Sequence, residues 1–386
     1  MRTNFSKTLC AVAFAAMTFS FVSCKDDTVV EEFGDEQAAA VASQFVDHTV
    51  APTYTNLAAK AELLVEQLKA AKANPTDAAV ETAANTFLEA REEWEKSEAF
   101  LFGAAGDFGI DPHIDSWPLD LDALNNLLNS PLMLAALDAD DGDVVAGDTL
   151  GNANLGFHGI EYILFSEGNP KAASAITDDE WIYAIAVAGD LRNRCFQLEV
   201  SWVGDDAPAS HVQKLEDLEL PFTVASGDYS YGENIKRAGN AGSTYASRKA
   251  ALMAIVSGCI DIADEVGSSK INSAYDAEDT TYIESPYSRR SIIDFYNNII
   301  SIQNVYMGGV SGQRDESKSL HKYLAAIDEN LDAKVISAIN NALDKINDMP
   351  APFVLNYSDA RNGEAVEACA SLSETLDEAL EALKNS

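Results

Sequence analysis

Residues 155–165 read Leu-Gly-Phe-His-Gly-Ile-Glu-Tyr-Ile-Leu-Phe. A helix turns about 100° per residue, so His158 and Glu161 would lie roughly 60° apart on one face and could converge on one ligand. Apolar side chains cover most of the remaining circumference, and Gly159 leaves a place where another element can come close. A helix that is apolar all round is a buried helix. The stretch therefore predicts a helix in the interior of a helical fold.

Two ionisable groups on such a helix need partners, because burying them is costly unless they are paired, hydrogen-bonded or bound to a metal. One interpretation is a metal or ligand site. The other is a structural pair, in which His158 and Glu161 satisfy each other or a neighbouring helix. The HExxH pattern of zinc hydrolases requires a second histidine one turn along, and this stretch has none. The motif alone leaves both interpretations open.

The rest of the chain is also helical in its pattern. Windows rich in Ala, Leu, Glu and Lys recur along it, and no alternation of period two is sustained. The pattern predicts an all-α fold, and 386 residues are enough for two domains of ordinary size. We expect helices at about residues 37–49, 53–73, 77–102, 121–128, 155–168, 178–203, 245–265, 288–307, 319–330, 333–347 and 363–384.

The helix expected before Gly103 carries charges in an unusual place. Arg91 and Glu98 fall within roughly 60° of Trp94 on its apolar face, whereas other acids of this helix gather on the opposite side. Acidic groups directed at solvent do not usually occupy an apolar face. Arg91 and Glu98 are therefore candidate site residues, and the alternative is that each pairs with a neighbouring helix.

A loop rich in Gly and Pro follows at residues 106–118, and it holds His113, Asp115 and Trp117. Loops held on a rigid scaffold often carry binding residues. This loop pairs His113 and Asp115 with a large aromatic residue, Trp117, and is therefore a candidate part of the site.

The two halves of the chain show one similarity. Aligning Gly103 with Gly308 places Gln303 where Glu98 stands, again within an apolar helical stripe. This similarity favours an approximate internal duplication. The segment before the second half is rich in Gly, Ser, Pro and Asp, which is typical of an interdomain connection. The expected division is an N-terminal helical domain at 37–204, a crossing at 205–244 and a C-terminal helical domain at 245–386.

The N-terminus reads as a lipoprotein signal. Basic residues precede a short apolar stretch, and Ser23 stands before Cys24, as in a bacterial lipobox with Phe21 at the usual leucine position. We expect residues 1–23 to be removed, Cys24 to be acylated and 24–36 to form a flexible acidic tether. The following Lys-Asp-Asp resembles an outer-membrane surface signal. The predicted location is the outer membrane, facing the periplasm or the cell surface.

The charge balance excludes nucleic-acid binding. The formal net charge is −36, and loss of Arg2 and Lys7 with the signal makes it −38. Such a surface repels nucleic acid and favours cations. The mature chain keeps Cys195, Cys259 and Cys369, which have neither metal-ligand spacing nor the pattern of a disulfide framework. We expect them to be buried apolar residues, although one disulfide is also possible.

With these residues in view, the chain resembles the imelysin family, whose members have also been called insulin-cleaving metalloproteinase outer-membrane proteins. The resemblance covers the whole mature chain. It rests on residues 91–103, on Asp-Ser-Trp-Pro at 115–118, on Gly-Phe-His-Gly-Ile-Glu at 156–161, which fits the GxHxxE signature, and on residues 285–308. It implies two duplicated helical bundles with GxHxxE near their interface, an association with iron acquisition, and a historical assignment as a metallopeptidase.

Carried onto this sequence, the resemblance makes His158 and Glu161 the motif residues and gives Arg91, Trp117, Ser285 and Asp294 as neighbours. His158, Glu161 and Glu98, with Asp115 as a fourth ligand, offer nitrogen and oxygen donors that suit iron or zinc. We therefore favour binding of a metal ion or a small iron complex in iron uptake, with a transport partner in the envelope. A metallopeptidase and a module for a non-metal ligand are the alternatives, and the sequence assigns no catalytic residue.

Overall fold

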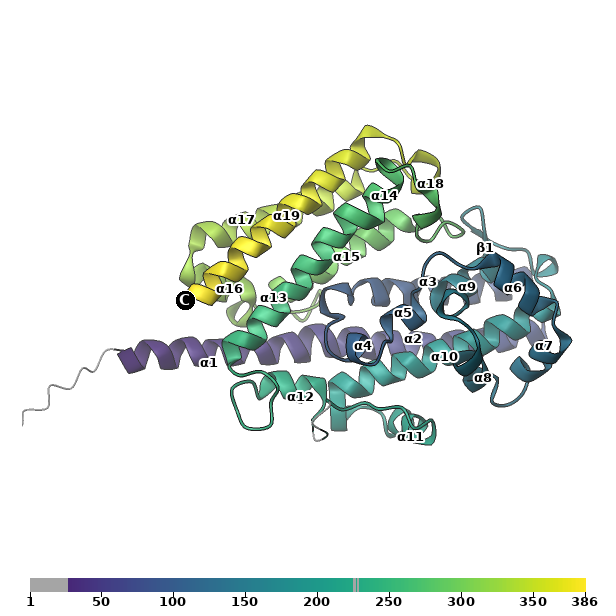
Figure 1. Ribbon diagram of the computed structural model, residues 1–386, viewed down its shortest axis with the longest axis horizontal. Helices are drawn as coiled ribbons and strands as arrows, with labels where there is room; N and C mark the ends of the chain where they lie inside the picture. The colour runs from purple at the N-terminus through teal and green to yellow at the C-terminus, as the bar shows by residue number, and fades with distance from the viewer. Residues whose placement is uncertain (1–26, 225–226, 228) are drawn as a thin grey trace, which may run out of the picture.

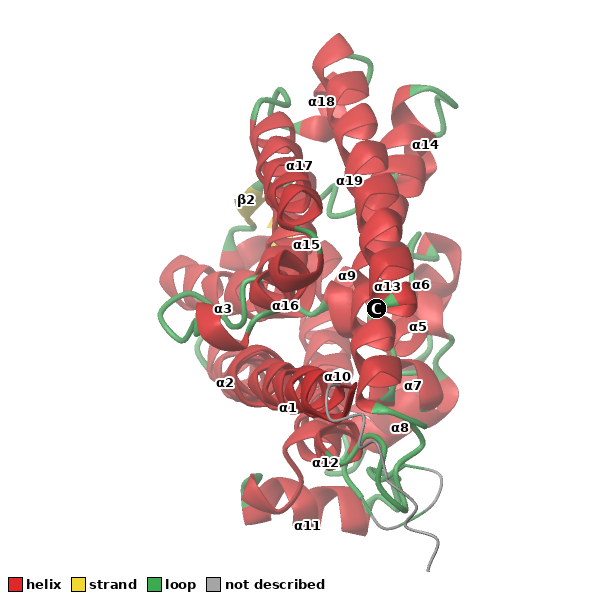
Figure 2. Cartoon of the chain, turned by 90° about the vertical axis from the view of Figure 1, so that its left-hand side faces the viewer, coloured by secondary structure: helices red, strands yellow, loops and turns green. Residues whose placement is uncertain are grey.

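A computed structural model describes residues 27–224, 227 and 229–386 of the chain. The predicted signal peptide, Cys24 and the first residues of the predicted tether lie outside this range. Within it, the regular structure is helical apart from one short antiparallel pair, β1 (Phe165–Ser166) and β2 (Asn169–Pro170), as Figure 2 shows. The prediction of an all-α fold is confirmed.

Two groups of helices make up the fold (Figure 1). In the first group, α2 (Ala51–Ala73) packs against α3 (Asp77–Glu95) and α10 (Asp178–Val203), and α8 (Gly142–Thr149) and α9 (Gly156–Leu164) pack against α10. The second group contains α13 (Arg248–Glu265), α15 (Ser291–Tyr306), α17 (Glu329–Asn347) and α19 (Ala360–Asn385). The groups meet where α3 and the following short helix pack on α15 and α13. The approximate duplication of the two halves stays a prediction.

Shorter helices connect and cover these groups. They are α4 (Ala104–Asp107), α5 (Asp111–Ile114), α6 (Leu121–Leu128), α7 (Pro131–Leu137), α11 (Ala209–Asp217), α12 (Tyr231–Lys236), α14 (Asn272–Tyr275), α16 (Leu320–Ile327) and α18 (Phe353–Asn356). The helices α11 and α12 lie in the segment predicted as an interdomain crossing, and α12 packs on α10 and on the N-terminal helix α1 (Asp27–Phe45). This segment therefore contributes to the packing of the first group.

The helices α1 and α2 form one long rod, joined by a π-helical turn at Val46–Val50 (Figure 1). Pro52 lacks the N–H that would bond to the His48 carbonyl. That carbonyl instead accepts a hydrogen bond from Val310 N at 2.8 Å. The rod begins at Asp27, so residues 27–36, predicted as a tether, are helical. Its first part, α1, packs on α13 and α16 and joins the two groups.

The helix predicted to reach Phe102 ends at Glu95. The backbone leaves the helical path because the Ser97 hydroxyl donates to Trp94 O and Ala99 N donates to the Ser301 hydroxyl on α15. Glu98 therefore stands on a 3-10 turn, η2 (Glu98–Phe100). The prediction of a continuous helix through Glu98 was wrong, because contacts with α15 override the local helical preference.

The start of α10 and the three cysteines agree with the sequence-based predictions. Thr177 and Glu180 form a reciprocal capping box before the first turn of α10. Cys195, Cys259 and Cys369 are free and buried. Within the described part of the chain, we find no helix whose length and apolar character would allow it to cross a bilayer.

Candidate functional site

The motif helix α9 lies in the interior, as its sequence predicts, and of its residues only Tyr162 is not fully buried. Two glycines allow its neighbours to approach. A Cβ on Gly159 would lie 2.1 Å from the Tyr183 hydroxyl, and a Cβ on Gly156 would lie 1.8 Å from the Ile114 carbonyl oxygen. The second approach brings the loop after α5 directly against α9. It places Asp115 beside His158.

His158 is 1% exposed and lies between two carboxylates. Its Nδ1 is 3.7 Å from Glu161 Oε2, and its Nε2 is 3.0 Å from Asp115 Oδ1. The second contact is an ion pair when the ring is protonated, although the buried Nε2 is not assigned a hydrogen bond among the described residues. Burial alone would lower the pKa of His158, but Asp115 and Glu161 raise it to about 9. Trp117 covers the ring, with 4.6 Å between ring centroids.

Glu161 and Asp115 face opposite nitrogens of the His158 imidazole ring. The two carboxylates therefore have different roles. Glu161 Oε1 accepts hydrogen bonds from the backbone N–H and the hydroxyl of Ser288, both at 2.7 Å. Its Oε2 makes no hydrogen bond within the described part of the chain and faces His158 Nδ1 at ion-pair distance. Glu161 therefore lies behind the His158 ring, and His158 Nε2 is directed toward Asp115.

Asp115 is held by three groups. Its Oδ1 is ion-paired with Arg91, its Oδ2 accepts a hydrogen bond from Trp94 Nε1 at 2.7 Å, and His158 lies beside it. Burial alone would raise the pKa of Asp115, but Arg91 and His158 hold it well below its usual range. Asp115 is therefore an ionised carboxylate in the interior of the protein.

Arg91 is the centre of the charge network. Its guanidinium is ion-paired with Asp115, Glu95 and Glu284, the last at 2.6 Å, and its Nε is 3.9 Å from Asp294. It is also 2% exposed. One buried guanidinium thus lies within ion-pair distance of four carboxylates.

Glu284 has a second cationic partner in Lys270, whose Nζ lies 3.2 Å from its Oε2. Lys270 stands in a π-helical turn, η6 (Val266–Ile271), that continues α13, and such turns are frequent at functional sites. Burial alone would raise the pKa of Glu284, but Lys270 and Arg91 lower it. Glu284 is a second ionised carboxylate close to His158.

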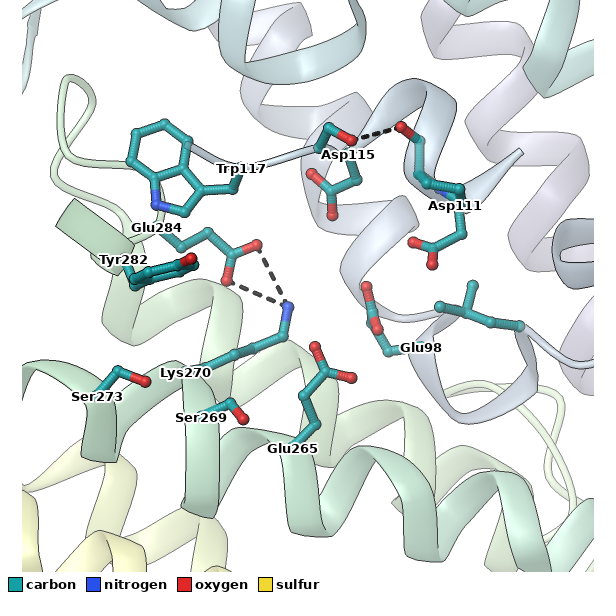
Figure 3. A pocket seen from close by; sticks show the side chains of 13 residues that line it. Glu98, Asp111, Asp115, Trp117, Glu265, Ser269, Lys270, Ser273, Tyr282 and Glu284 are labelled. Atoms are coloured by element: carbon teal, nitrogen blue, oxygen red, sulfur yellow. Dashed lines mark hydrogen bonds and ion pairs between the residues drawn. The ribbon is translucent and has the colours of Figure 1, made fainter. Parts of the chain in front are cut away.

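The network borders a cavity of about 310 Å³ (Figure 3). Its walls come from both helix groups and include five carboxylates and one lysine. They are Glu98, Asp111, Asp115, Glu265, Glu284 and Lys270. Trp117 and Tyr282 also line it. Because the carboxylates outnumber the basic groups, the cavity favours a cationic ligand over an anionic one.

Two sets of side chains could each hold a cation. Asp115, His158 and Glu284 each offer one ligand atom, and these atoms lie within 4.8 Å of one another. Glu95, Glu98 and Asp115 form a second set with the same property. The Nε2 of His158 and the two ionised carboxylates beside it fit a metal ion, with one nitrogen and two oxygen donors.

The structure brings most predicted site residues into this region. Asp294 accepts a hydrogen bond from the Ser285 hydroxyl and faces Arg91, and burial raises its pKa to about 7 despite Arg91. Glu98 belongs to the set with Glu95 and does not share one with His158. The segment predicted as a loop contains the short helix α5, and His113 on that helix points away to α10, where its Nε2 lies 2.7 Å from Asp190.

Sequence reasoning missed Glu284, Lys270 and Glu95. Glu284 lies in a loop without periodic pattern, and Lys270 lies on a π-helical turn that no sequence rule marks. Glu95 carried a usable signal, because it stands four residues after Arg91, where an opposite charge on a helix forms a pair.

Comparisons with known proteins agree with this architecture. The family model "Peptidase_M75: Imelysin" matches residues 50–379. Iron-regulated protein A of Synechococcus elongatus is 28% identical over 341 residues, which cover 86% of this chain and 83% of that protein. A crystal structure described as an iron-regulated protein A precursor from Parabacteroides distasonis has a TM-score of 0.76 and 27% identity, and covers 90% of this chain and 95% of that chain. An imelysin-like protein from Psychrobacter arcticum has the same fold, with a TM-score of 0.60 at 13% identity, over 88% of this chain and 93% of that one.

Proposed function

This chain belongs to the imelysin family. We propose that it binds a metal ion through Asp115, His158 and Glu284 and that this binding functions in iron uptake. The observation that carries the proposal is the buried His158 Nε2, which lies 3.0 Å from Asp115 and close to a second ionised carboxylate, Glu284. Glu161 faces the other ring nitrogen at 3.7 Å and can orient the ring when it accepts a hydrogen bond from Nδ1. Iron is the preferred metal and zinc the alternative, because both accept imidazole and carboxylate ligands.

The proposed setting is the cell envelope. The lipobox-like Ser-Cys at 23–24 supports an acylated Cys24 that anchors the protein in the outer membrane. A metal ion or small iron complex would be the cargo, and a transport protein in the envelope the partner that receives it. The strongly acidic surface supports a cation as the cargo.

Peptidase activity is the competing function, and the family name carries that word. A zinc peptidase needs a positioned general base and a cleft for an extended substrate. His158 is the one histidine in the described cluster, and the adjoining cavity of about 310 Å³ fits a hydrated ion or a small complex better than an extended peptide. A binding role therefore fits the site better than peptide hydrolysis.

Metal binding is tested by equilibrium dialysis of the mature chain against Fe²⁺ under anaerobic conditions and against Zn²⁺. We expect tight binding, and we expect His158→Gln and Glu284→Gln each to lower the affinity by at least about tenfold, because each removes one donor. The matched control is His113→Gln, which alters a histidine–aspartate pair outside the cluster.

Affinity equal to wild type in both ligand variants, with the helical circular dichroism unchanged, would refute the proposed site. Metal-dependent cleavage of a peptide library that His158→Gln abolishes would instead establish the peptidase.

The affinity should also depend on pH. Without metal, His158 has a pKa of about 9, so it is protonated at neutral pH. A metal ion at Nε2 must displace that proton, and binding is therefore favoured as the pH rises. We expect the affinity for Mn²⁺ to rise about tenfold per pH unit from pH 6 to 8, as for release of one proton. Titration calorimetry measures this slope; a slope of zero would contradict the assignment of Nε2 as a ligand.

A further inference from the structure

The second set of carboxylates is adjacent to the proposed metal site. Glu95, Glu98 and Asp115 each offer an oxygen, and these oxygens lie within 4.8 Å of one another. Asp115 also belongs to the set that contains His158 and Glu284. A carboxylate offers about four lone-pair sites, so each oxygen of Asp115 can contact a cation in addition to its present partner, Arg91 at Oδ1 or Trp94 at Oδ2.

Glu98 is the side chain that points to a ligand. It is 6% exposed, and among the described residues no hydrogen bond or ion pair to its side chain is found. Burial raises its pKa well above the usual range, although Lys270 acts in the opposite direction, so a cation bound here must displace its proton. Buried carboxylates are otherwise paired, because leaving one without a partner is costly. The group lines the cavity, and Figure 3 shows it directed into the same space as Asp115, Glu265 and Lys270. An unpartnered buried acid that faces a cavity is a candidate cation ligand.

The other members of the set are held in place without Glu98. Glu95 lies at the interface of α3 and α15, where it accepts a hydrogen bond from Asn298 and pairs with Arg91. Asp115 is fixed by Arg91 and Trp94. The donors are therefore preorganised, and Glu98 is the one that can turn toward a bound ion.

We propose that Glu95, Glu98 and Asp115 form a second cation position next to the first, with Asp115 bridging the two. This inference rests on the proposed function, since it takes the position at His158 as the first. Oxygen-only donors suit a hard divalent cation such as Mn²⁺ or Fe²⁺. Carboxylates from several helices that share two metal ions are a known way to build a site in a helical bundle.

The test is the number of Mn²⁺ ions bound per mature chain, measured by equilibrium dialysis and electron paramagnetic resonance. We expect two ions in the wild type, with spectra broadened by magnetic coupling through the shared carboxylate. Glu98→Gln should bind one ion and give the six-line spectrum of isolated Mn²⁺. This variant should fold, because Glu98 has no partner to lose among the described residues.

His158→Gln separates this inference from the proposed function. If it lowers the count from two to one and Glu98→Gln removes the other ion, both proposals hold. One ion in the wild type, unchanged in Glu98→Gln and lost in His158→Gln, would overturn the second position alone. Two ions retained in His158→Gln would refute the first position instead. The control Asp264→Asn, in an acidic surface cavity with Asp261 and Asp377, should still bind two ions; a lower count there would assign the extra ion to the surface.

Discussion

Replacing Arg91 with methionine is expected to destabilise the metal-free protein by about 3–5 kcal/mol, because removing one partner of a buried ion pair leaves the other charge uncompensated. Arg91 is 2% exposed and serves Glu95, Asp115 and Glu284 at once. Urea unfolding at pH 7 in the presence of a chelator measures the loss. Arg91→Lys keeps the charge but loses the planar fork that contacts several carboxylates, so its cost should be intermediate.

The matched control for Arg91 is Lys334→Met. Lys334 forms an exposed ion pair with Glu378 at 3.4 Å, and such pairs contribute only about 0–1 kcal/mol. A cost for Arg91→Met as small as that of Lys334→Met would show that the buried carboxylates are neutral or hydrated without Arg91. The central role given to the guanidinium would then be wrong.

The second large effect is expected at Gly156, the glycine that opens the motif. Its φ is +65°, which costs other residues about 1–3 kcal/mol. In addition, a Cβ there would lie 1.8 Å from the Ile114 carbonyl oxygen, so the backbone of the preceding loop must move. Gly156→Ala should therefore lower both the melting temperature and the metal affinity, because Asp115 follows Ile114 directly and would move away from His158.

The control for this change is Gly151→Ala. Gly151 has a negative φ, and a Cβ there would meet no atom within 4 Å. It should be neutral or slightly stabilising, because alanine restricts the unfolded chain. If Gly156→Ala bound metal as tightly as Gly151→Ala, the position of Asp115 would not depend on this contact.

The helices of the fold were largely predictable from sequence, because their periodicity reflects burial. The capping box of α10 and the buried character of α9 follow from local residue patterns. The end of α3 could not be predicted in this way. The helix stops before Glu98 because Ala99 N donates a hydrogen bond to the Ser301 hydroxyl on α15, more than 200 residues away. No local pattern contains that information.

Some residues of the candidate site could likewise be predicted from local sequence, and others could not. Arg91, His158 and Glu161 were found because charged residues on an apolar helix face stand out, and Asp115 because it lies in a Gly- and Pro-rich segment beside a large aromatic residue. The partition of roles between Asp115 and Glu161 was not predictable, because it depends on which ring nitrogen each faces. Glu284 was missed because only the packing of its loop on α3 and α9 brings it to the site.

The contacts that complete the site have a kinetic consequence. Ser288 and Glu161 are 127 residues apart in the chain, and Arg91 and Glu284 are 193 apart. Bringing such distant residues together has a high entropic cost, so these contacts are expected to form late in folding. A cation that binds only the completed site stabilises the native state more than the folding transition state. Its main effect would be to slow unfolding, so that the loaded protein persists longer than its equilibrium stability alone would imply.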